Sequence, residues 1–495
     1  MRIGIDIGGT HTDAVLVDAH DHIIAACKEV TTVPVEVAVC AAVQKLLAFC
    51  HPNAVTAIMI GSTHATNALL ERKELLKVGL IRVAGHKPDL LPARAWPQDL
   101  AEMVLCGFET ISGGHECDGS EITPCDEKEV ISVIQRLEAQ GAEALAITSV
   151  FSPVNKHHEQ LVQQCALQHT VLSVTISSDI GGIGFIEREN ATILNASLQK
   201  VVQQGFGSLQ GALHALGIHA PLFMVHNDGT CMDLERGRKF PIFTLSSGQT
   251  NSFRGGARLA GVDGALVMDI GGTSSDIGIV ENGYPKCSSR AVTIGGVRLN
   301  FSLPDVVSLA IGGGTVVNGD AIGPASVAKN LLTHSQAFGG TITTLTDAAL
   351  LTGHLVIEGT DTHNISLSVD AAHAIMKKVH TELEKGVTLA RGRQKEVPVI
   401  VVGGASSFFP QASCPDFASV ANAYGAALAE ISATIDVVVS LHNRDAVIDE
   451  LELQAKERAI ANGASSDTVR IIRREIIPYA YSQDGLSRVI ISAAG

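Results

Sequence analysis

The sequence predicts an α/β protein of two lobes, each built around the same aspartate-bearing hairpin. The pentapeptide Asp-Ile-Gly-Gly-Thr occurs twice, at Asp6–Thr10 and at Asp269–Thr273, and a further Asp follows each copy at the same offset, at Asp13 and at Asp276. In addition, apolar runs of strand length alternate with segments of helical length along the chain, which is the pattern of α/β architecture. The repeat and the alternation together predict two related halves.

The hairpins come first in each half. Each copy of the repeat consists of an apolar run, the Gly-Gly-Thr loop and a second apolar run that ends in a turn, which predicts two antiparallel strands. The further elements, in chain order, are a strand over Ala57–Ile60, a helix over Thr66–Lys73, a helix over Glu127–Gln140, a strand over Ala144–Val150, a strand and Gly-rich loop over Pro398–Ser407, a helix over Ala418–Ile431, a helix over Asn443–Asn462 ending before Gly463, and a strand over Arg488–Ser492.

Composition excludes several classes of protein. Hydrophobic residues make up 46% and charged residues 18% of the 495 residues, so the chain is not of the disordered type. The formal net charge of −15 opposes binding to nucleic acid. The ten cysteines form no Cys-x-x-Cys pair, and no run is apolar enough for a signal peptide or a membrane span. We therefore expect a reduced, soluble, cytoplasmic protein without a nucleic-acid or membrane partner.

The loop of each hairpin has the composition of a phosphate-binding turn. Successive small residues let backbone N–H groups converge on phosphate oxygens, and a Thr or Ser at the tip adds a hydroxyl donor. Asp6 and Asp269 cannot face phosphate closely without a cation between them, so we predict that both bind Mg²⁺ or its water, or orient the nucleophile. A plain hairpin turn is the alternative for a single copy, but it explains two matching copies poorly. The predicted phosphate-binding residues are Gly8, Gly9, Thr10, His11, Thr12 and Asp13 in the first loop, and Gly271, Gly272, Thr273, Ser274 and Asp276 in the second.

Other nucleotide-binding motifs are missing from the sequence. It contains no Gly-x-x-x-x-Gly-Lys-Ser/Thr, and no Gly-x-Gly-x-x-Gly that follows a strand and opens a helix. The two hairpins and the late loop Val401–Ser407 resemble the actin, sugar kinase and heat-shock chaperone type of ATPase. That resemblance implies two ribonuclease H-like repeats with a nucleotide cleft between the lobes, and it places Gly403 and Gly404 next to the adenosine.

Further segments resemble the hydantoinase A and 5-oxoprolinase family, and they run in the order that the family shows. They are Gly61–Arg72, Gly113–Gly119, Glu187–Thr192 with Asn195–Ala196, Ser247–Gly248 with Asn251–Ser252, Gly312–Gly314, and Asn422–Ala427. The resemblance implies an N-terminal lobe over 1–185 with the first phosphate loop, and a second lobe over 186–495 with the second phosphate loop and the adenosine loop. It also adds Gly312, Gly313 and Gly314 to the nucleotide-binding residues.

The same resemblance implies an activity. It is an ATP- and Mg²⁺-dependent hydrolysis that opens a cyclic amide or imide, such as a hydantoin, 5-oxoproline or a related lactam, after phosphorylation of the amide oxygen. The resemblance also implies a hydantoinase B-like second subunit, and a homo-oligomer stays open. The alternatives are a small-molecule kinase and an ATP-gated subunit of a hydantoinase or carboxylase complex, because the family includes ketone carboxylase subunits. Gln249 departs from the family, in which Pro more often follows Ser-Gly.

Substrate-binding residues are expected where polar side chains share a face or match the family segments. If the segment is helical, Arg188, Thr192 and Asn195 lie on one face, with Glu187 beside them. A solvated surface explains that face equally well. His64, Asn67, Asn251 and Ser252 are expected near the substrate because of the resemblance alone.

Overall fold

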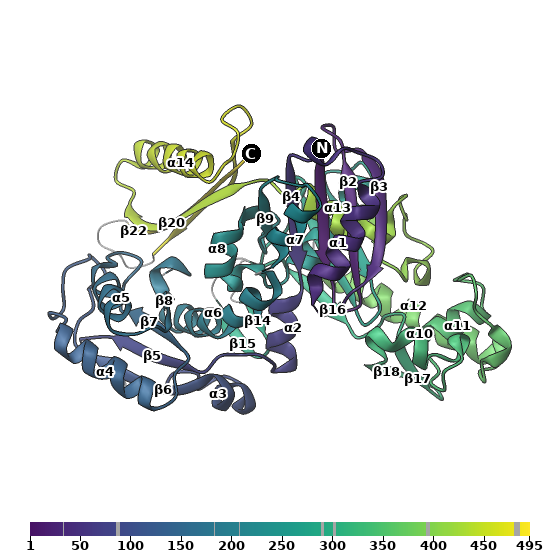
Figure 1. Ribbon diagram of the computed structural model, residues 1–495, viewed down its shortest axis with the longest axis horizontal. Helices are drawn as coiled ribbons and strands as arrows, with labels where there is room; N and C mark the ends of the chain where they lie inside the picture. The colour runs from purple at the N-terminus through teal and green to yellow at the C-terminus, as the bar shows by residue number, and fades with distance from the viewer. Residues whose placement is uncertain are drawn as a thin grey trace.

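The structure is a computed structural model that describes residues 1–32, 34–85, 90–182, 184–206, 208–288, 292–299, 303–392, 397–479 and 486–495 (Figure 1). The strands are β1 (Arg2–Ile7), β2 (His11–Val17), β3 (Ile23–Val30), β4 (Ala57–Ser62), β5 (Val78–Val83), β6 (Leu105–Ile111), β7 (Ala144–Ser149), β8 (Ser173–Ile176), β9 (Leu222–Val225), β10 (Cys231–Asp233), β11 (Ala265–Ile270), β12 (Ser275–Glu281), β13 (Tyr284–Pro285), β14 (Val292–Ile294), β15 (Val297–Leu299), β16 (Val306–Leu309), β17 (Thr315–Asn318), β18 (Ala321–Ser326), β19 (Val399–Val402), β20 (Ser432–Ser440), β21 (Arg470–Pro478) and β22 (Leu486–Ala494).

The α-helices are α1 (Val35–Leu46), α2 (His64–Glu71), α3 (Gln98–Val104), α4 (Glu127–Ala139), α5 (His157–His169), α6 (Phe185–Phe206), α7 (Leu209–Ala215), α8 (Leu234–Lys239), α9 (Ser247–Leu259), α10 (Leu331–His334), α11 (Leu345–Leu351), α12 (Val369–Arg391), α13 (Ala421–Ala427) and α14 (Arg444–Ala461). Within the described residues, no helix combines the length and apolarity needed to cross a membrane.

Two sheets carry the repeated hairpin in the same arrangement. In the first sheet, of order β10-β9-β4-β1-β2-β3, β1 pairs with β2 antiparallel and with β4 in parallel, and Asp6 lies opposite Asp13. In the second, β11 pairs with β12 antiparallel and with β19 in parallel, and Asp269 lies opposite Asp276. Each hairpin also has an outer antiparallel neighbour, β3 or β16. The two predicted hairpins are therefore confirmed, and the repeat extends to the neighbouring strands.

Helices α9 and α13 lie against each other between these two sheets. Helix α13 packs on β1 and β2, and α9 packs on β11 and β12. The helices approach at their backbones, because a Cβ on Gly255 would collide with the carbonyl oxygen of Ala421. The predicted helix over Ala418–Ile431 is shorter in the structure and ends at Ala427. It ends there because the following residues turn toward β10, where Cys231 N–H donates to the Glu430 carbonyl.

A separate parallel sheet lies at the lower left of Figure 1, in the order β6-β5-β7-β8. Alternate residues of its strands face opposite sides, as the pleat requires. Ile81 and Ile147 pack with α4 and α5, whereas Leu80 and Ala146 pack with α6. Both faces are therefore covered, which is typical of parallel sheets. The predicted helix at Glu127 and the predicted strand at Ala144 belong to this unit and are confirmed.

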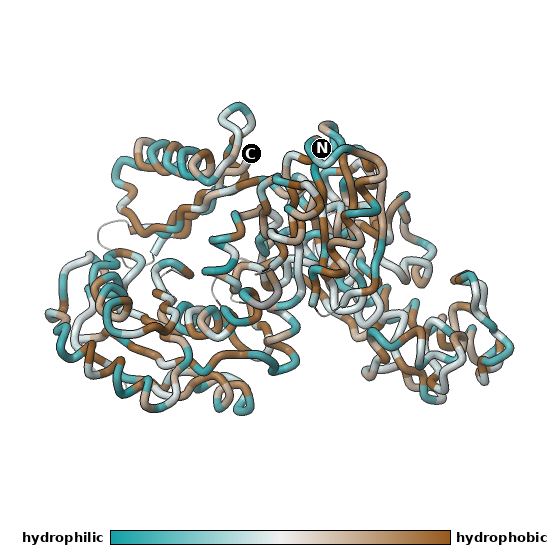
Figure 2. Tube along the Cα trace, viewed as in Figure 1, coloured by the Kyte–Doolittle hydropathy of each residue, from teal (hydrophilic) through white to brown (hydrophobic). Residues whose placement is uncertain are grey.

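The end of the chain forms a small unit of its own. Strands β20, β22 and β21 form an antiparallel sheet in that order, and α14 covers one of its faces. Figure 2 shows hydrophobic residues along β20 and β22 and a mixture of hydrophobic and hydrophilic residues on α14. Gly463 follows the helix with a φ of 109°, a backbone conformation that favours glycine. The predicted helix over Asn443–Asn462 and the predicted terminal strand are confirmed.

The predicted boundary between residues 185 and 186 stays a prediction. Strands β9 and β10 follow that boundary in sequence, yet they belong to the same sheet as β1 and β2. Helix α6 begins at Phe185 and packs against both β7 and β8 of the earlier parallel sheet. The chain therefore crosses between units more than once after residue 185.

Candidate functional site

The loops of the two repeated hairpins have the same backbone turn. Gly8 N–H donates to the His11 carbonyl at 3.0 Å, and Gly271 N–H donates to the Ser274 carbonyl at 2.9 Å. The tips lie at the surface, where Gly9, Gly272 and Thr273 are exposed and Thr10 is half-buried. Small exposed residues in a tight turn leave the backbone accessible to an anion. The loop tips thus lie at the surface of the molecule at the ends of β1 and β11, whereas Thr12 and Asp13 of the first loop are buried.

Neighbouring segments support each loop from behind. Thr31 Oγ1 donates to the Gly8 carbonyl at 2.9 Å and lies 3.0 Å from Thr12 Oγ1, whose side chain is buried. The second loop is held by backbone bonds instead, because Gly313 N–H donates to the Gly271 carbonyl at 3.0 Å. The Gly312–Gly314 segment therefore lies directly against the second Gly-Gly-Thr loop, and its binding of nucleotide stays a prediction.

The aspartates of the first hairpin are bridged by an asparagine of α13. Asn422 Nδ2 donates to Asp6 Oδ2 at 3.0 Å and to Asp13 Oδ2 at 2.9 Å. Lys28, which lies opposite Asp13 on β3, places its Nζ 2.5 Å from Asp13 Oδ1. Both carboxylates are almost fully buried. The pair is therefore fixed in position by a neutral amide and one cation.

The aspartates of the second hairpin have neutral partners. Ser308 Oγ donates to Asp276 Oδ1 at 2.5 Å from the neighbouring strand β16. Helix α9 supplies the other partners. The side chain of Gln249 hydrogen-bonds to Asp276, and that of Ser252 hydrogen-bonds to Asp269. These two aspartates have no salt bridge among the described residues.

Helix α9 connects the two hairpins directly. The side chain of Ser252 contacts Asp269 in the second hairpin, and that of the preceding residue, Asn251, contacts Asp6 in the first. Asn251 and Ser252 are both buried. Two consecutive side chains of one helix thus reach aspartates of both lobes, so a shift of α9 would move both at once.

Burial shifts the ionisation of these carboxyls. Desolvation, followed by the charge of Asp13, raises the pKa of Asp6 to about 7, although the side chains of Asn251 and Asn422 act in the opposite direction. Desolvation likewise raises the pKa of Asp276 to about 6 and raises that of Asp269. Because burial is the largest cause of each shift, a cation placed beside these carboxyls would lower their pKa values and favour the ionised form.

A hydrated divalent cation fits this environment. Asp6 Oδ1 is buried without a hydrogen bond of good geometry among the described residues. Among all the residues that the structure describes, no three His, Cys, Asp or Glu side chains are close enough to bind one metal ion directly. Mg²⁺ commonly keeps several waters and binds through one or two carboxylates plus phosphate oxygens, so it does not need such a cluster. The metal role of Asp6 and Asp269 stays a prediction.

A glycine faces the first aspartate of each hairpin. Gly61 on β4 lies opposite Asp6, and a Cβ there would collide with Asp6 Oδ1 and with the amide of Asn251. Gly403, at the end of β19, has a φ of 93°, and a Cβ there would collide with Asp269 Oδ1. Gly404 next to it is exposed. The predicted adenosine loop therefore begins beside the carboxylate of Asp269.

His64 and Asn67 belong to α2, and the side chain of Asn67 approaches Gly9 of the first Gly-Gly-Thr loop. Helix α2 begins where β4 ends, and His64 Nδ1 is 2.8 Å from Ser62 Oγ. Asn67 Nδ2 donates to Thr63 Oγ1 at 3.3 Å and lies within contact distance of Gly9. The structure thus places Asn67 near the first loop, and the binding of substrate by His64 and Asn67 stays a prediction.

The four polar residues expected on α6 lie elsewhere. Arg188 is fully buried and donates to Ser177 Oγ and to the carbonyl of Ser149, at the end of the separate parallel sheet. The others are also engaged in structural contacts: Thr192 Oγ1 donates to the Arg188 carbonyl, Asn195 Nδ2 donates to Thr175 Oγ1 and to the Lys239 carbonyl, and Glu187 pairs with Arg298. These contacts hold α6 in place, and the predicted role of the four residues in substrate binding remains untested.

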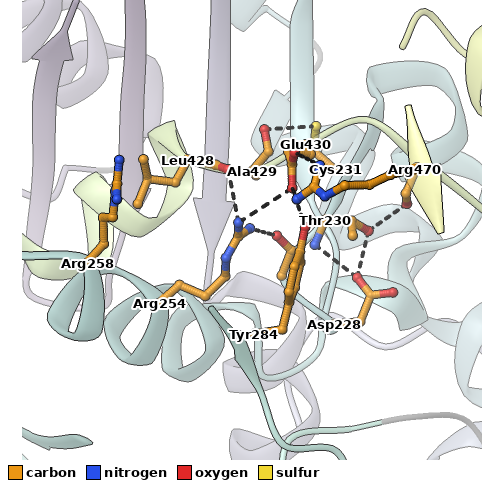
Figure 3. A network of polar contacts seen from close by, with 12 residues as sticks. Asp228, Thr230, Cys231, Arg254, Arg258, Tyr284, Leu428, Ala429, Glu430 and Arg470 are labelled. Carbon is orange, nitrogen blue, oxygen red and sulfur yellow. Dashed lines mark hydrogen bonds and ion pairs between the residues drawn. The ribbon is translucent and has the colours of Figure 1, made fainter. Parts of the chain in front are cut away.

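A polar network surrounds Arg254 in the second half of α9 (Figure 3). Arg254 of α9 donates to the Leu428 carbonyl at 3.2 Å and lies 4.5 Å from the ring centre of Tyr284. Tyr284 and Arg470 both bond to the carboxylate of Glu430, which lies 4.0 Å from Arg254. Because Arg470 belongs to β21, the network ties the C-terminal unit to the helix that spans the two hairpins.

Sequence reasoning missed several of the residues that shape the site. Asn422 lies in a segment that carries the family resemblance, but a lone asparagine gives no indication that it bridges two distant carboxylates. Lys28 and Thr31 depend on the pairing of β2 with β3, which only the register reveals. Gln249 was noticed as a departure from the family, and the structure places it beside Asp276.

Two family profiles cover most of the chain. Residues 2–170 match the hydantoinase/oxoprolinase N-terminal region, and residues 188–402 match hydantoinase/oxoprolinase. Curated relatives include the acetophenone carboxylase gamma subunit of Aromatoleum aromaticum, which is 28% identical over 71% of this chain and 53% of that protein. The caprolactamase subunit alpha of Pseudomonas jessenii is 27% identical over 79% of this chain and 60% of that protein. The 5-oxoprolinase of Saccharomyces cerevisiae is 25% identical over 72% of this chain and 32% of that protein.

The fold is shared with solved structures over the whole chain. An ATP-dependent caprolactamase from Pseudomonas jessenii matches with a TM-score of 0.77 and 21% identity, covering 100% of this chain and 87% of that one. A nucleotide-free acetone carboxylase matches with a TM-score of 0.76 and 17% identity over the same shares. These likenesses confirm the predicted fold class, whereas the chain spans only about a third to three fifths of the length of the curated relatives described above. The chain belongs to the hydantoinase/oxoprolinase family.

Proposed function

We propose that the chain binds Mg-ATP between its two aspartate hairpins and opens a cyclic amide by phosphorylating the amide oxygen. The observation that carries this proposal is the pair of matching loops whose aspartates are joined by Asn251 and Ser252 of α9. The names of two relatives, caprolactamase and 5-oxoprolinase, support the substrate class. A substrate between the loops would face small residues and hydroxyls, which suits phosphoryl transfer because that reaction needs alignment and charge stabilisation.

Phosphorylation of the amide oxygen would overcome the low reactivity of the amide carbon. Nitrogen donation makes the carbonyl carbon a poor electrophile. ATP supplies a phosphoryl group to the amide oxygen and leaves as ADP. Water then adds to the activated carbon, the ring C–N bond breaks as the nitrogen takes up a proton, and an acyl phosphate results. A second water attacks the acyl carbon, and phosphate leaves with the former amide oxygen.

Each residue has a part in this scheme. The backbone of Gly8–Thr10 and Gly271–Thr273 binds phosphate oxygens, with the Gly312–Gly314 segment behind the second loop, and Gly403 and Gly404 approach the adenosine. Asp6 and Asp269 would hold the metal through its waters, and the cation would neutralise charge that develops on the phosphates. Asn422 keeps Asp6 and Asp13 in position. Because all of these groups bind or orient, no protein nucleophile takes part.

A second subunit is part of the proposal. Two of the relatives are named as subunits, gamma and alpha, and this chain spans about half of their length. We propose that a hydantoinase B-like partner completes the activity. An ATP-gated role in a carboxylase complex is the second candidate, and the similarity to the acetophenone carboxylase gamma subunit favours it over a small-molecule kinase.

The test is Mg²⁺-dependent phosphate release from ATP, followed together with ring opening for hydantoin, 5-oxoproline, 2-pyrrolidone and ε-caprolactam. We expect one phosphate per ring opened, and a large loss of both in Asp6→Asn and in Asp269→Asn. Asp263→Asn is the matched control, because Asp263 is exposed two residues before β11. Phosphate that stays on the substrate would indicate a kinase, and nucleotide binding without either reaction, also with a partner subunit added, would contradict the proposal.

A further inference from the structure

Asn227 carries a side-chain amide that has no visible structural use. Its side chain is fully buried, and neither Oδ1 nor Nδ2 has a hydrogen-bond partner in the part of the chain that the structure describes. The backbone of the same residue is well held, because its N–H donates to the Phe243 carbonyl at 2.7 Å and its carbonyl accepts from Thr250 Oγ1 at 2.8 Å. A buried amide without partners is costly, so its presence calls for an explanation such as a ligand or a water.

The position of Asn227 connects it to the phosphate loops. It lies just beyond the carboxyl end of β9, which runs parallel to β4 and, beyond it, β1. Continuing the register of these strands places Asn227 level with Gly8 of the first phosphate loop. Strands lie about 4.8 Å apart, so this register separates the β9 and β1 positions by two strand spacings, about 10 Å, along the same edge of the sheet. The carboxyl ends of parallel strands are where open α/β sheets bind ligands.

Helix α9 links Asn227 to the catalytic carboxylates. Thr250 bonds to the Asn227 carbonyl, and the next residue, Asn251, contacts Asp6. Earlier in the same helix, Ser247 Oγ donates to the Ser62 carbonyl at 3.3 Å, at the end of β4 between the two. One helix thus fixes the spacing between the unpartnered amide and the aspartates of both hairpins. A substrate held by Asn227 would lie alongside the transferred phosphoryl group.

We propose that Asn227 is a specificity-determining residue that binds the amide edge of the substrate, an inference that rests on the proposed function. In a small ring the amide is cis, so its C=O and N–H point to the same side. A carboxamide side chain offers one donor and one acceptor with matching spacing. Asn227 Nδ2 donates to one lone pair of the substrate oxygen, whose other lone pair stays free to attack phosphorus. Asn227 Oδ1 accepts from the substrate N–H, which increases electron density on that oxygen.

The other asparagines near the site lie beside groups of the chain. Asn422 donates to Asp6 and Asp13. Asn251 also lacks a hydrogen bond of good geometry among the described residues, but its amide interacts with the Asp6 carboxylate. Asn195 uses its amide to bond Thr175, the Lys239 carbonyl and the Ile242 N–H. Because Asn227 is closed off from solvent in this structure, substrate binding must be coupled to a local opening around the end of β9.

The test measures binding of matched ligand pairs to the full chain, with the partner subunit if the activity needs one. The pairs are ε-caprolactam with ε-caprolactone, and 2-pyrrolidone with γ-butyrolactone, because a lactone keeps the ring and the carbonyl but lacks the N–H. We expect wild type to bind the lactam about 10- to 100-fold more tightly, since the lactone leaves Oδ1 unpaired. In Asn227→Leu the ratio should fall to about 1 for either pair.

Thermal stability provides the second readout. Asn227→Leu should leave the protein at least as stable as wild type, since it removes an unpaired buried amide, whereas the matched control Asn195→Leu should destabilise it. A clear loss of stability in Asn227→Leu would indicate a structural water and overturn the inference. An unchanged lactam-to-lactone ratio in a variant that still opens lactams would overturn this inference alone. Absence of lactam binding and opening in wild type would overturn the proposed function together with it.

Discussion

Asp6→Asn should make the protein more stable while it abolishes ATP turnover. The pKa of the Asp6 carboxyl is raised to about 7, above its ordinary value of about 4, so the folded state binds this proton more tightly than the unfolded state. The unfolded chain ionises this carboxyl above about pH 4, whereas the folded protein ionises it only above about pH 7. Stability is therefore lost as the pH rises between these two values. At 1.36 kcal/mol per pKa unit, the penalty reaches about 4 kcal/mol at pH 8 and falls to about 2 kcal/mol at pH 5.5.

An asparagine avoids this penalty and fits the site. Its Oδ1 can accept the bond from Asn422 that Asp6 Oδ2 now accepts, and its Nδ2 can donate to Asn251 Oδ1, which has no partner among the described residues. Since 1 kcal/mol shifts the melting temperature by about 2–4 °C in a unit of 150–250 residues, we expect a rise of at least about 4 °C at pH 8. The difference between variant and wild type should shrink at pH 5.5.

The assay is thermal unfolding followed by circular dichroism at both pH values, in EDTA and without nucleotide, because metal or ATP would stabilise wild type through Asp6. Asp228→Asn is the matched control. Burial favours protonation of Asp228, but His226 and Thr230 outweigh it and hold the pKa below its usual range. This substitution should therefore destabilise the protein at pH 8. If Asp6→Asn lowers stability as well, Asp6 is a structural aspartate and the reasoning is refuted.

Two further predictions concern the packing around the site. Gly403→Ala should lower the free energy of unfolding by about 1–3 kcal/mol and lower ATP turnover, because a Cβ there meets Asp269 Oδ1 at a positive φ. Gly404→Ala should be tolerated, because the space around Gly404 is open. Equal losses in melting temperature for the two variants would contradict this prediction. Arg82→Met should cost about 3–5 kcal/mol in chemical denaturation, since it leaves Glu189 buried and unpaired, and Glu189→Met in the same chain should restore much of the loss. If the double variant recovers no stability, the loss in Arg82→Met does not come from the unpaired charge of Glu189, and this prediction is wrong.

Much of the fold could be predicted because its signals are local. The two hairpins were evident from Asp6–Asp13 and Asp269–Asp276, since loop composition and flanking apolar runs determine a hairpin within a dozen residues. The residues within each segment likewise predicted the helices α4 and α14. The helix expected over Ala418–Ile431 was too long because its end depends on pairing with Cys231, nearly two hundred residues earlier in the chain.

The site was predictable only in part, for a related reason. The phosphate loops are contiguous in sequence, whereas their supports are not. Asn422 meets Asp6 across more than four hundred residues, and Asn227 reaches the same sheet edge through β9. The polar residues of α6 show a related limit of periodicity, because their shared helical face did not reveal that Arg188 bonds within the fold. Their binding of substrate stays a prediction. Periodicity identifies a common face but not what covers it.

The central claim is that the amide oxygen itself receives the phosphoryl group, and an isotope experiment tests it most directly. A lactam that the enzyme opens is labelled with ¹⁸O in its carbonyl, and turnover is run with Mg-ATP in unlabelled water. The account predicts that the inorganic phosphate released carries the ¹⁸O, because the former amide oxygen leaves with phosphorus. If the label stays entirely in the carboxylate of the opened product and hydroxylamine traps no acyl phosphate during turnover, the amide oxygen was not phosphorylated and the proposed mechanism is contradicted.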